Sequence, residues 1–351
     1  MAFFLFLSCV LWGIGHLMRA PYRMRWAMIG VLYLAVLLAH FTLPDENPLR
    51  QSIGGTAGGW LVLGGAIALI YGYSRLLKRL KAKPTPAEKP SNGLFTETEL
   101  DRYARHIVLR ELGGPGQKKL KEARVLVIGA GGLGSPALLY LAAAGVGTIG
   151  VVDDDIVDNS NLQRQVIHRD ADIGIPKVFS AERAMLAQNP NVVVKPYNRR
   201  LNETDAAELI ADYDIVLDGT DNFDTRYLVN RACVAAAKPL VSGALTQWEG
   251  QISTFDPAKA TPCYQCIFPE APAPELAPSC SEAGVLGPLP GVVGSMMAVE
   301  AIKVITGAGT PLHNAMLIYD ALYGESRRIG LKPRSDCPVC YSGAHEKDKT
   351  A

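Results

Sequence analysis

The sequence lacks a sizeable net charge of either sign: 35 Lys and Arg residues oppose 34 Asp and Glu residues in a chain of 351, which leaves +1 at pH 7. This balance excludes a global electrostatic attraction to nucleic acid or to an acidic partner. Charge is also scarce, at 20 % of the chain against 48 % hydrophobic residues. The scarcity is local, since no Asp, Glu, Lys or Arg occurs in residues 2–18, 26–43 and 53–73.

These three uncharged segments predict transmembrane helices, because a membrane-spanning helix needs ~20 mainly apolar residues. Segments 26–43 and 53–73 meet this requirement, and segment 2–18 is marginal. The loop after the first segment and the stretch after the third are rich in Arg and Lys, whereas the second loop carries Asp45 and Glu46. Basic loops stay in the cytoplasm. The N-terminus is therefore expected outside and the large C-terminal part inside.

The sequence allows two other interpretations of the N-terminus. Segment 2–18 could be a cleaved signal peptide, although it lacks a basic n-region and an obvious cleavage site. The chain could also span the membrane twice instead of three times. We interpret residues 1–80 as a membrane anchor and residues 81–95 as a linker, because the latter hold proline and charge without apolar periodicity. A catalytic domain is expected over residues 96–345, before a tail of residues 346–351.

The domain that follows the linker shows the alternation of strands and helices typical of an α/β protein. Apolar runs at residues 124–128 and 148–152 predict strands that are buried on both faces. Glycine-rich residues 129–134 join the first strand to a helix expected over residues 135–144. This order predicts a Rossmann-like, doubly wound, largely parallel sheet.

The glycine-rich turn predicts a nucleotide site. Gly129, Gly131 and Gly134 follow the Gly-x-Gly-x-x-Gly pattern, which places backbone N–H groups at a helix N-terminus where a phosphate can bind. Asp153 follows at about the 20-residue spacing of an acid that binds a ribose hydroxyl. A tight turn without a ligand is the plain alternative.

The residues after the second strand favour cleavage of a nucleoside triphosphate over hydride transfer. Residues 153–165 combine acids and amides with Arg164, and Lys177 follows shortly. A redox dinucleotide site has little use for these cations, whereas departing pyrophosphate needs positive groups and a carboxylate that holds Mg²⁺. Asp221, after a strand expected over residues 215–217, supplies such a carboxylate. An NAD-dependent oxidoreductase would leave this set unexplained.

At these residues the sequence resembles the ThiF/HesA/MoeB family, relatives of ubiquitin-activating enzymes, and especially its molybdopterin-synthase adenylyltransferase branch. The matching segments lie at residues 102–110, 129–134, 160–165, 174–177, 218–222, 250–251, 262–266 and 337–340. The resemblance implies a sheet with an antiparallel C-terminal extension. It also implies ATP-dependent adenylation of the C-terminal glycine of a ubiquitin-like sulfur carrier that ends in Gly-Gly. It does not cover residues 1–95, and a membrane anchor departs from the usual soluble members.

The resemblance implies roles for individual residues. Gly131 and Gly132 would approach the nucleotide with bare backbone, and Asp153 would bind the ribose. Arg105 would reach the phosphates in the neighbouring subunit of a homodimer. Phosphate contacts and Mg²⁺ coordination are expected from Asn161, Arg164, Lys177 and Asp221. The expected catalytic residues are Arg105, Arg164, Lys177 and Asp221.

Plain structural alternatives accompany these roles. Arg105 could be a solvated helix residue, Asn161 a turn residue and Lys177 a helix cap. His106, His168 and His313 have no partner nearby in the sequence and are expected to be structural; they are left out of the predicted site.

Four of the seven cysteines form two Cys-x-x-Cys pairs, which favour metal or redox chemistry over a disulfide framework. The pairs are Cys263 with Cys266 and Cys337 with Cys340. Their wide separation is unusual for a zinc ribbon, but the resemblance implies a structural Zn²⁺ held by all four thiolates. Two redox disulfides are the alternative. Cys280 lies in a proline-rich stretch that resembles the crossover loop of the family and is a candidate for a covalent bond to the carrier.

The implied partners are a Gly-Gly sulfur carrier, a second copy of the chain and a separate sulfur donor, since few residues follow Cys340. The expected location is a bacterial inner membrane, with several spans and the catalytic domain in the cytoplasm. A thiamine-pathway carrier is an alternative substrate. A nucleotide-binding membrane scaffold without catalysis is an alternative function.

Overall fold

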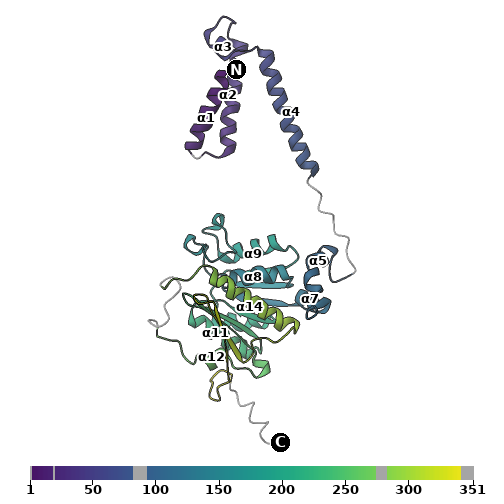
Figure 1. Cartoon of the computed structure of the whole chain (residues 1–351), viewed down its shortest axis with the longest axis vertical. Helices are drawn as coiled ribbons and strands as arrows, with labels where there is room; N and C mark the ends of the chain where they lie inside the picture. The colour runs from purple at the N-terminus through teal and green to yellow at the C-terminus, as the bar shows by residue number, and fades with distance from the viewer. Residues whose placement is uncertain (1, 19, 82–92, 274–282, 341–351) are drawn as a thin grey trace. The chain divides into compact units, whose positions relative to one another are not determined.

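A computed structural model describes residues 2–18, 20–81, 93–273 and 283–340. The chain divides into two compact units, Met1–Lys89 and Pro90–Ala351 (Figure 1). The boundary falls within the segment that the sequence predicts as a linker. Each unit is described by itself.

The N-terminal unit is helical. Its elements are α1 (Ala2–Leu17), α2 (Tyr22–Thr42), α3 (Pro48–Ile53) and α4 (Ala57–Lys81). Helices α1 and α2 lie side by side as a hairpin (Figure 1). Trp12 of α1 meets Trp26 of α2 edge to face, with ring centroids 5.2 Å apart. This aromatic contact joins the two helices near their connecting turn.

Trp60 joins α4 to the rest of the N-terminal unit. Its side chain is 1 % exposed and packs with Val36 and Ile53. The indole Nε1 donates to the carbonyl of Gly54 at 3.0 Å, and the Trp60 carbonyl accepts from the Tyr33 hydroxyl at 2.6 Å. The indole N–H and the backbone carbonyl of Trp60 are therefore satisfied inside an apolar cluster.

Two helices of this unit, Tyr22–Thr42 and Ala57–Leu77, are long and apolar enough to cross a membrane, and α1 is shorter. Many of their large apolar side chains, such as Leu34 and Leu69, are exposed in the protein alone. Helix α4 departs from the predicted span of residues 53–73. It starts later because Gly54 and Gly55 have positive φ, and it runs on through residues that favour helix.

The C-terminal unit is built on an eight-stranded sheet in the part of the chain that the structure describes. The strands run in the order β3 (Val193–Tyr197), β2 (Thr148–Val152), β1 (Arg124–Ile128), β4 (Ile215–Asp218), β5 (Leu240–Leu245), β6 (Glu249–Phe255), β7 (Ala315–Asp320) and β8 (Glu325–Gly330). The first five are parallel, and β6 to β8 are antiparallel. The predicted Rossmann-like sheet with an antiparallel C-terminal extension is confirmed.

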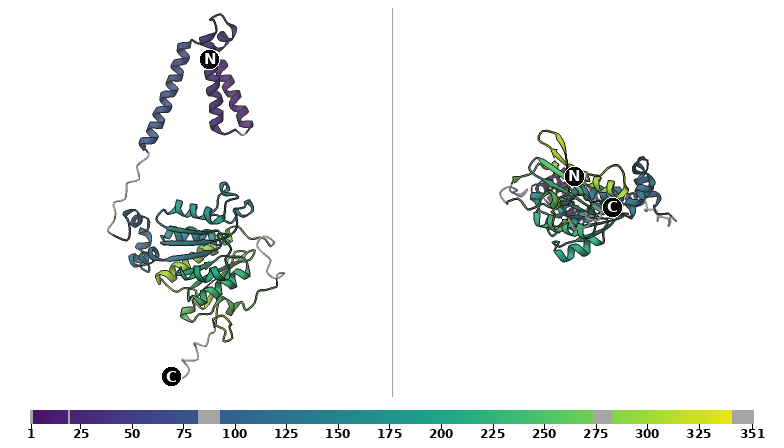
Figure 2. Two further views of the ribbon diagram at one scale, coloured as in Figure 1. Left: turned by 180° about the vertical axis from the view of Figure 1, so that it is seen from behind. Right: turned by 90° about the horizontal axis from the view of Figure 1, so that it is seen from below.

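Helices cover both faces of this sheet (Figures 1 and 2). One face carries α7 (Gly113–Glu122), α8 (Gly134–Ala144), α9 (Lys177–Gln188) and α14 (Pro288–Thr306); the other carries α10 (Glu203–Ala211) and α11 (Phe223–Ala235). Strand β1 shows the alternation, since Val125 faces one core and Leu126 the other. Helix α14 also has the length and apolarity of a membrane span, but half of it is buried in this core.

Shorter helices complete the unit. They are α5 (Glu97–Arg102), α6 (Ala104–Ile107) and α12 (Tyr264–Ile267), with 3₁₀ turns at Asn159–Asn161, Asp170–Asp172 and Pro257–Lys259. Thr96 caps α5 with a reciprocal capping box to Glu99. This cap fixes the point at which the chain enters the C-terminal unit.

The turn between β1 and α8 requires glycine at two positions. Gly129 has φ +93°, a backbone conformation that residues with a side chain rarely adopt. A Cβ on Gly134 would lie 1.9 Å from the carbonyl oxygen of Gly129. Because the added Cβ would meet backbone atoms of Gly129, no side-chain movement can relieve the overlap. The turn therefore holds the start of α8 directly against the end of β1.

We expect Gly134→Ala to destabilise the C-terminal unit by about 1–3 kcal/mol or more, because its methyl group has to displace backbone. Gly131→Ala is the matched control, since its Cβ would meet nothing closer than 3.6 Å. Denaturant unfolding of the two variants measures the difference. Equal stabilities for both would contradict the assigned turn geometry.

Candidate functional site

A cleft of about 1520 Å³ opens at the carboxyl ends of the parallel strands. The strand order reverses between β1 and β4, and ligands of open α/β sheets bind at such a switch point. Among the predicted residues, the lining includes Gly131, Gly132, Asp153, Arg164, Lys177 and Asp221. The fold thus brings six of the eight predicted nucleotide-site residues to one cavity.

Asp153 lies at the end of β2 and holds the glycine-rich turn. One carboxylate oxygen accepts from the Ala130 N–H at 2.7 Å, and the other accepts from the Asp155 N–H at 2.9 Å. Burial raises the pKa of the Asp153 carboxyl, and the positive charge of Lys177 opposes this rise. Each oxygen keeps a second lone pair, so the carboxylate can still accept from a ligand hydroxyl.

The two predicted cations are held by neighbours within the site. Lys177 begins α9, its side chain is 5 % exposed, and its Nζ pairs with the Asp155 carboxylate at 2.7 Å. Arg164 donates to Oδ1 of Asn161 at 2.8 Å. Asn161 does not line the cleft; it contacts Arg164 from the side. Both positive groups are therefore oriented by the protein itself.

Asp221 follows β4 and is exposed at the cleft wall. Two residues that the sequence reasoning missed support its loop. The Asp218 carboxylate accepts from the backbone and hydroxyl of Thr220 at 3.0 and 2.7 Å. Arg226 of α11 is buried and donates to the carbonyls of Thr220 and Gly243, the latter at 2.8 Å. The position of Arg226 just after the Asp-Gly-Thr-Asp motif was the signal available in the sequence.

Gln165 is another lining residue that the sequence reasoning left out. It is 4 % exposed, and its Oε1 has no hydrogen-bond partner among the described residues. A buried amide oxygen without a partner costs about 1–3 kcal/mol, which a ligand donor would recover. This orphan acceptor marks the same end of the cleft as the glycine-rich turn.

Two predicted residues lie elsewhere. Arg105 sits on α6, is exposed, and does not line the cleft of its own chain. Its expected role in a neighbouring subunit stays a prediction. Cys280 falls within residues 274–282, outside the described part of the chain.

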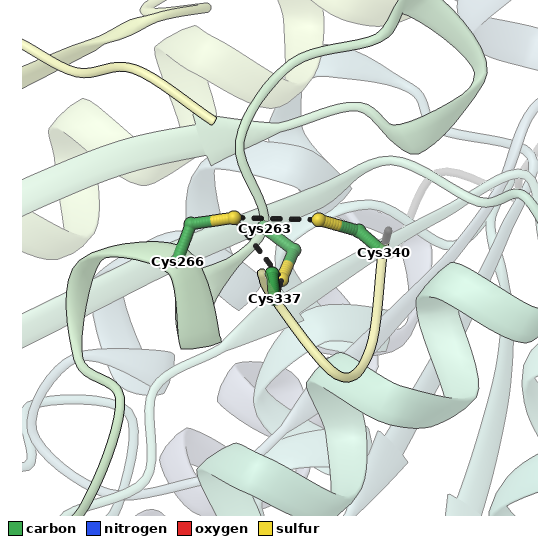
Figure 3. A group of neighbouring side chains, drawn as sticks. All are labelled: Cys263, Cys266, Cys337 and Cys340. Atoms are coloured by element: carbon green, nitrogen blue, oxygen red, sulfur yellow. Dashed lines mark hydrogen bonds between the residues drawn. The ribbon is translucent and has the colours of Figure 1, made fainter. Parts of the chain in front are cut away.

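The four predicted cysteines converge in space (Figure 3). Their Sγ atoms lie within 4.8 Å of one another, with Cys263 at 3.6 Å from Cys337 and Cys266 at 3.3 Å from Cys340. Tetrahedral Zn–S bonds of ~2.3 Å place neighbouring sulfurs about 3.8 Å apart, so the cluster has the size of a zinc site. Three of the four residues are buried, and the donor set is the one that Zn²⁺ prefers.

Outer hydrogen bonds support the same interpretation. Asn230 of α11 is 1 % exposed, accepts from the Tyr264 N–H at 2.9 Å and points its Nδ2 at Cys263 Sγ, 3.7 Å away. The Arg334 N–H donates to Cys266 Sγ at 3.4 Å. N–H groups aimed at sulfur stabilise thiolates, which are the form that binds metal. The cluster could therefore hold zinc.

We expect the purified chain to contain about one zinc per copy, since the four thiolates close a tetrahedral site. Cys337→Ala should lose most of the metal because three ligands remain. Cys233→Ala is the control, as Cys233 is buried in α11 outside the cluster. Elemental analysis after dialysis measures both. Metal-free wild-type protein, or equal zinc in the two variants, would count against the site.

Comparisons with known proteins agree with this geometry. The ThiF family model matches residues 103–339. A sulfur carrier protein adenylyltransferase of Thermus thermophilus is 50 % identical over 250 residues, which cover 70 % of this chain and 92 % of that protein. The SAMP-activating enzyme E1 of Haloferax volcanii is 48 % identical, with 70 % and 90 % covered. A probable adenylyltransferase/sulfurtransferase MoeZ of Mycobacterium tuberculosis is 51 % identical, with 72 % and 65 % covered.

Solved structures resemble the chain as well. The crystal structure of Escherichia coli MccB with ATP has a TM-score of 0.60 at 25 % identity and covers 73 % of this chain and 76 % of that one. MccB with AMPCPP and MccA gives a TM-score of 0.58 at 25 % identity, with 65 % and 69 % covered. The family match lies entirely within the C-terminal unit. The chain therefore belongs to the ThiF family.

Proposed function

We propose that the chain is an adenylyltransferase that uses ATP to activate the C-terminal glycine of a ubiquitin-like sulfur carrier. The observation that carries this proposal is the convergence of the glycine-rich turn with Arg164, Lys177 and Asp221 in one cleft. The relatives named as adenylyltransferases support it, because the alignments cover most of the C-terminal unit. The name of the Thermus thermophilus relative gives a sulfur carrier protein as the class of substrate.

The chemistry requires charge neutralisation more than proton transfer. A carboxylate oxygen of the carrier attacks the α-phosphorus of ATP, a new O–P bond forms, and the bond to the β-phosphate breaks to release pyrophosphate. The carboxylate is already ionised, so no general base is needed. Arg164 and Lys177 would stabilise the negative charge on the leaving group. Asp221 offers the oxygen ligand that Mg²⁺ prefers.

The size of the cleft favours a protein tail beside the nucleotide. Small-molecule sites occupy ~300–1,000 Å³, and this cleft is larger. Its lining continues from the glycine-rich turn to Trp248, Leu322 and Tyr323 at the antiparallel strands. An extended Gly-Gly tail could therefore approach the α-phosphate from that side.

Finer features of the proposal follow from the resemblance of the sequence. The carrier is proposed to be of the molybdopterin-synthase type, with a thiamine-pathway carrier as the alternative. A homodimer would allow Arg105 to reach the phosphates of the partner's site, consistent with its exposure on α6. Sulfur would come from a separate donor protein, and Cys280 is kept as a candidate for a covalent bond to the carrier.

A nucleotide-binding scaffold without catalysis is the competing function. A scaffold needs affinity for a nucleotide but has no need of cations placed against a leaving group. Lys177 is nevertheless held nearly buried at the cleft, where its ammonium group pairs with Asp155. The retained set of Arg164, Lys177 and Asp221 therefore favours the enzyme.

We further propose that the N-terminal unit anchors the chain in a membrane, with the C-terminal unit in the cytoplasm. The length and apolarity of Tyr22–Thr42 and Ala57–Leu77 support this location. So does the distribution of basic residues: Arg23 and Arg25 precede the apolar part of α2, and Arg75 follows that of α4. In a bacterium this membrane would be the inner one.

Pyrophosphate exchange tests the activity. Incubation with ATP, labelled pyrophosphate and a Gly-Gly carrier should form labelled ATP. Asp221→Ala should lower the rate of this exchange about 100-fold or more, because the Mg²⁺ that neutralises charge in the transition state loses a protein ligand. Asp224→Ala is the matched control, since Asp224 lies on α11 outside the main cleft. Carriers of the molybdopterin and thiamine types are compared. No exchange with any carrier would favour the scaffold.

Membrane fractionation tests the anchor. The full chain should remain in the membrane pellet after alkaline carbonate extraction, because two long apolar helices resist removal. A chain that starts at Gly93 should appear in the soluble fraction. Extraction of the full chain by carbonate would show that the N-terminal unit does not span the bilayer.

A further inference from the structure

The two peptide groups on either side of Ala130 are each held by a side chain. The N–H of Ala130 donates to the Asp153 carboxylate at 2.7 Å, and its carbonyl accepts from Nε2 of His168 at 2.9 Å. His168 is 6 % exposed and lies in the loop before α9. His168, for which no partner could be identified from the sequence, is thus hydrogen-bonded to the middle of the glycine-rich turn.

The hydrogen bond from His168 fixes the direction of the next N–H. A trans peptide is planar, so the N–H of Gly131 points opposite to the carbonyl of Ala130. That carbonyl points at His168, which places the Gly131 N–H on the other side. Gly131 lines the cleft, and its N–H has no partner within the described ranges. A free donor therefore remains at the nucleotide end of the cavity.

The surroundings of His168 keep a hydrogen on Nε2. The carbonyl of Ala130 can only accept, so Nε2 must donate. Nδ1 lies 2.9 Å from the Ser180 hydroxyl, which lies 2.7 Å from the Asp172 carboxylate. If Ser180 donates to Asp172, the ring carries a second hydrogen on Nδ1; if it donates to Nδ1, the ring is neutral. Nε2 keeps its hydrogen in both cases.

The titration of the ring agrees with the neutral form near neutral pH. Burial lowers the pKa of His168, while its hydrogen bond to Ala130 and the carboxylate of Asp172 oppose this change. The other oxygen of Asp172 pairs with Arg183 at 2.9 Å, so this carboxylate keeps an ion pair whichever way the Ser180 hydroxyl donates. Ser180 lies on α9, the helix that begins with Lys177. Helix α9 therefore carries Lys177 and also contacts, through Ser180 and His168, the glycine-rich turn.

We infer that His168 is a positioning residue for the phosphates of ATP, acting through the Gly131 N–H that it aims into the cleft. The inference rests on the proposed ATP site. His168 itself touches no phosphate in this arrangement. Its contribution is to prevent rotation of one peptide plane, which would otherwise remove a phosphate donor from the site.

Two amide substitutions separate this role from general support of the fold. In His168→Gln the side-chain NH₂ takes the place of Nε2 and can still donate to Ala130. In His168→Asn the amide is one methylene shorter, so it takes the place of Nδ1 and faces Ser180. We expect the Asn variant to bind Mg-ATP about 10-fold more weakly, since a buried hydrogen bond and an aligned donor are lost. The Gln variant should stay within about threefold of wild type.

The measurement is calorimetric binding of Mg-ATP to the full chain in detergent, with adenosine binding followed by ligand-observed NMR. Adenosine lacks phosphates, so its affinity should be equal in all variants. His313→Leu is the control for lost stability, because His313 is largely buried against Asp256 and does not line the cleft. Unfolding midpoints are recorded for each. His168→Leu replaces the Asn variant if the latter does not fold.

The outcomes are distinct. Failure of the wild type to bind Mg-ATP would remove the proposed function and this inference with it. Wild-type binding with an unchanged affinity in His168→Asn would overturn the inference alone. Equal weakening of ATP and adenosine, or equal weakening by the Gln and Asn variants, would assign His168 to the fold and not to the phosphates.

Discussion

The nucleotide end of the cleft depends on one backbone contact, in which Gly134 lies against the carbonyl of Gly129 without room for a methyl group. This contact places the start of α8 at the end of β1. A Cβ on Gly129 would lie 3.3 Å from the carbonyl oxygen of Gly219, which follows β4, so the turns after the two strands lie close together. Asp153 after β2 and Asp221 after β4 are consequently brought to the two sides of one turn. The site is a result of how tightly three strand ends pack.

The charges of the site are arranged before any ligand arrives. Lys177 is nearly buried but pairs with Asp155, a carboxylate that is 66 % exposed. A phosphate that binds Lys177 in place of Asp155 leaves this carboxylate to water, to which it is already largely exposed. Arg164 is already oriented by Asn161. Most of the cost of organising the cations is therefore met during folding, which is what electrostatic catalysis requires.

The sequence predicted those parts of the site that depend on neighbours along the chain. The glycine-rich turn, Asp153 and Lys177 were recognisable because strand, turn and helix follow one another within a single motif. The contacts of His168 and Arg226 were not, since Ala130 lies 38 positions from His168 and Gly243 lies 17 from Arg226. Asn161 does not line the cleft, and its contact with Arg164 was not indicated by the sequence; its role toward the phosphates stays a prediction. Such second contacts arise from tertiary packing, which a local pattern does not encode.

The helical N-terminal unit shows the same limit. Apolar segments predicted where helices occur, but the ends of α4 depend on two glycines with positive φ and on helix-favouring residues beyond the apolar run. Hydropathy measures transfer into lipid and not the backbone preferences that start or stop a helix. The four cysteines are a contrasting case. Their identity suggested a shared site, and the fold alone brought the two pairs together.

The cysteine cluster also has a consequence for the polymer chain. Cys263 and Cys337 are 74 positions apart, and the chain between them includes α14, β7 and β8. A metal that joins these positions closes a loop around much of the antiparallel extension. In the chain-entropy description, closing a loop of this length reduces the conformational entropy of the unfolded state. The loss raises the free energy of that state by about 4 kcal/mol at room temperature. The exposed outer strand β8, which lies inside this loop, would then be stabilised by the loop closure as well as by its antiparallel pairing with β7.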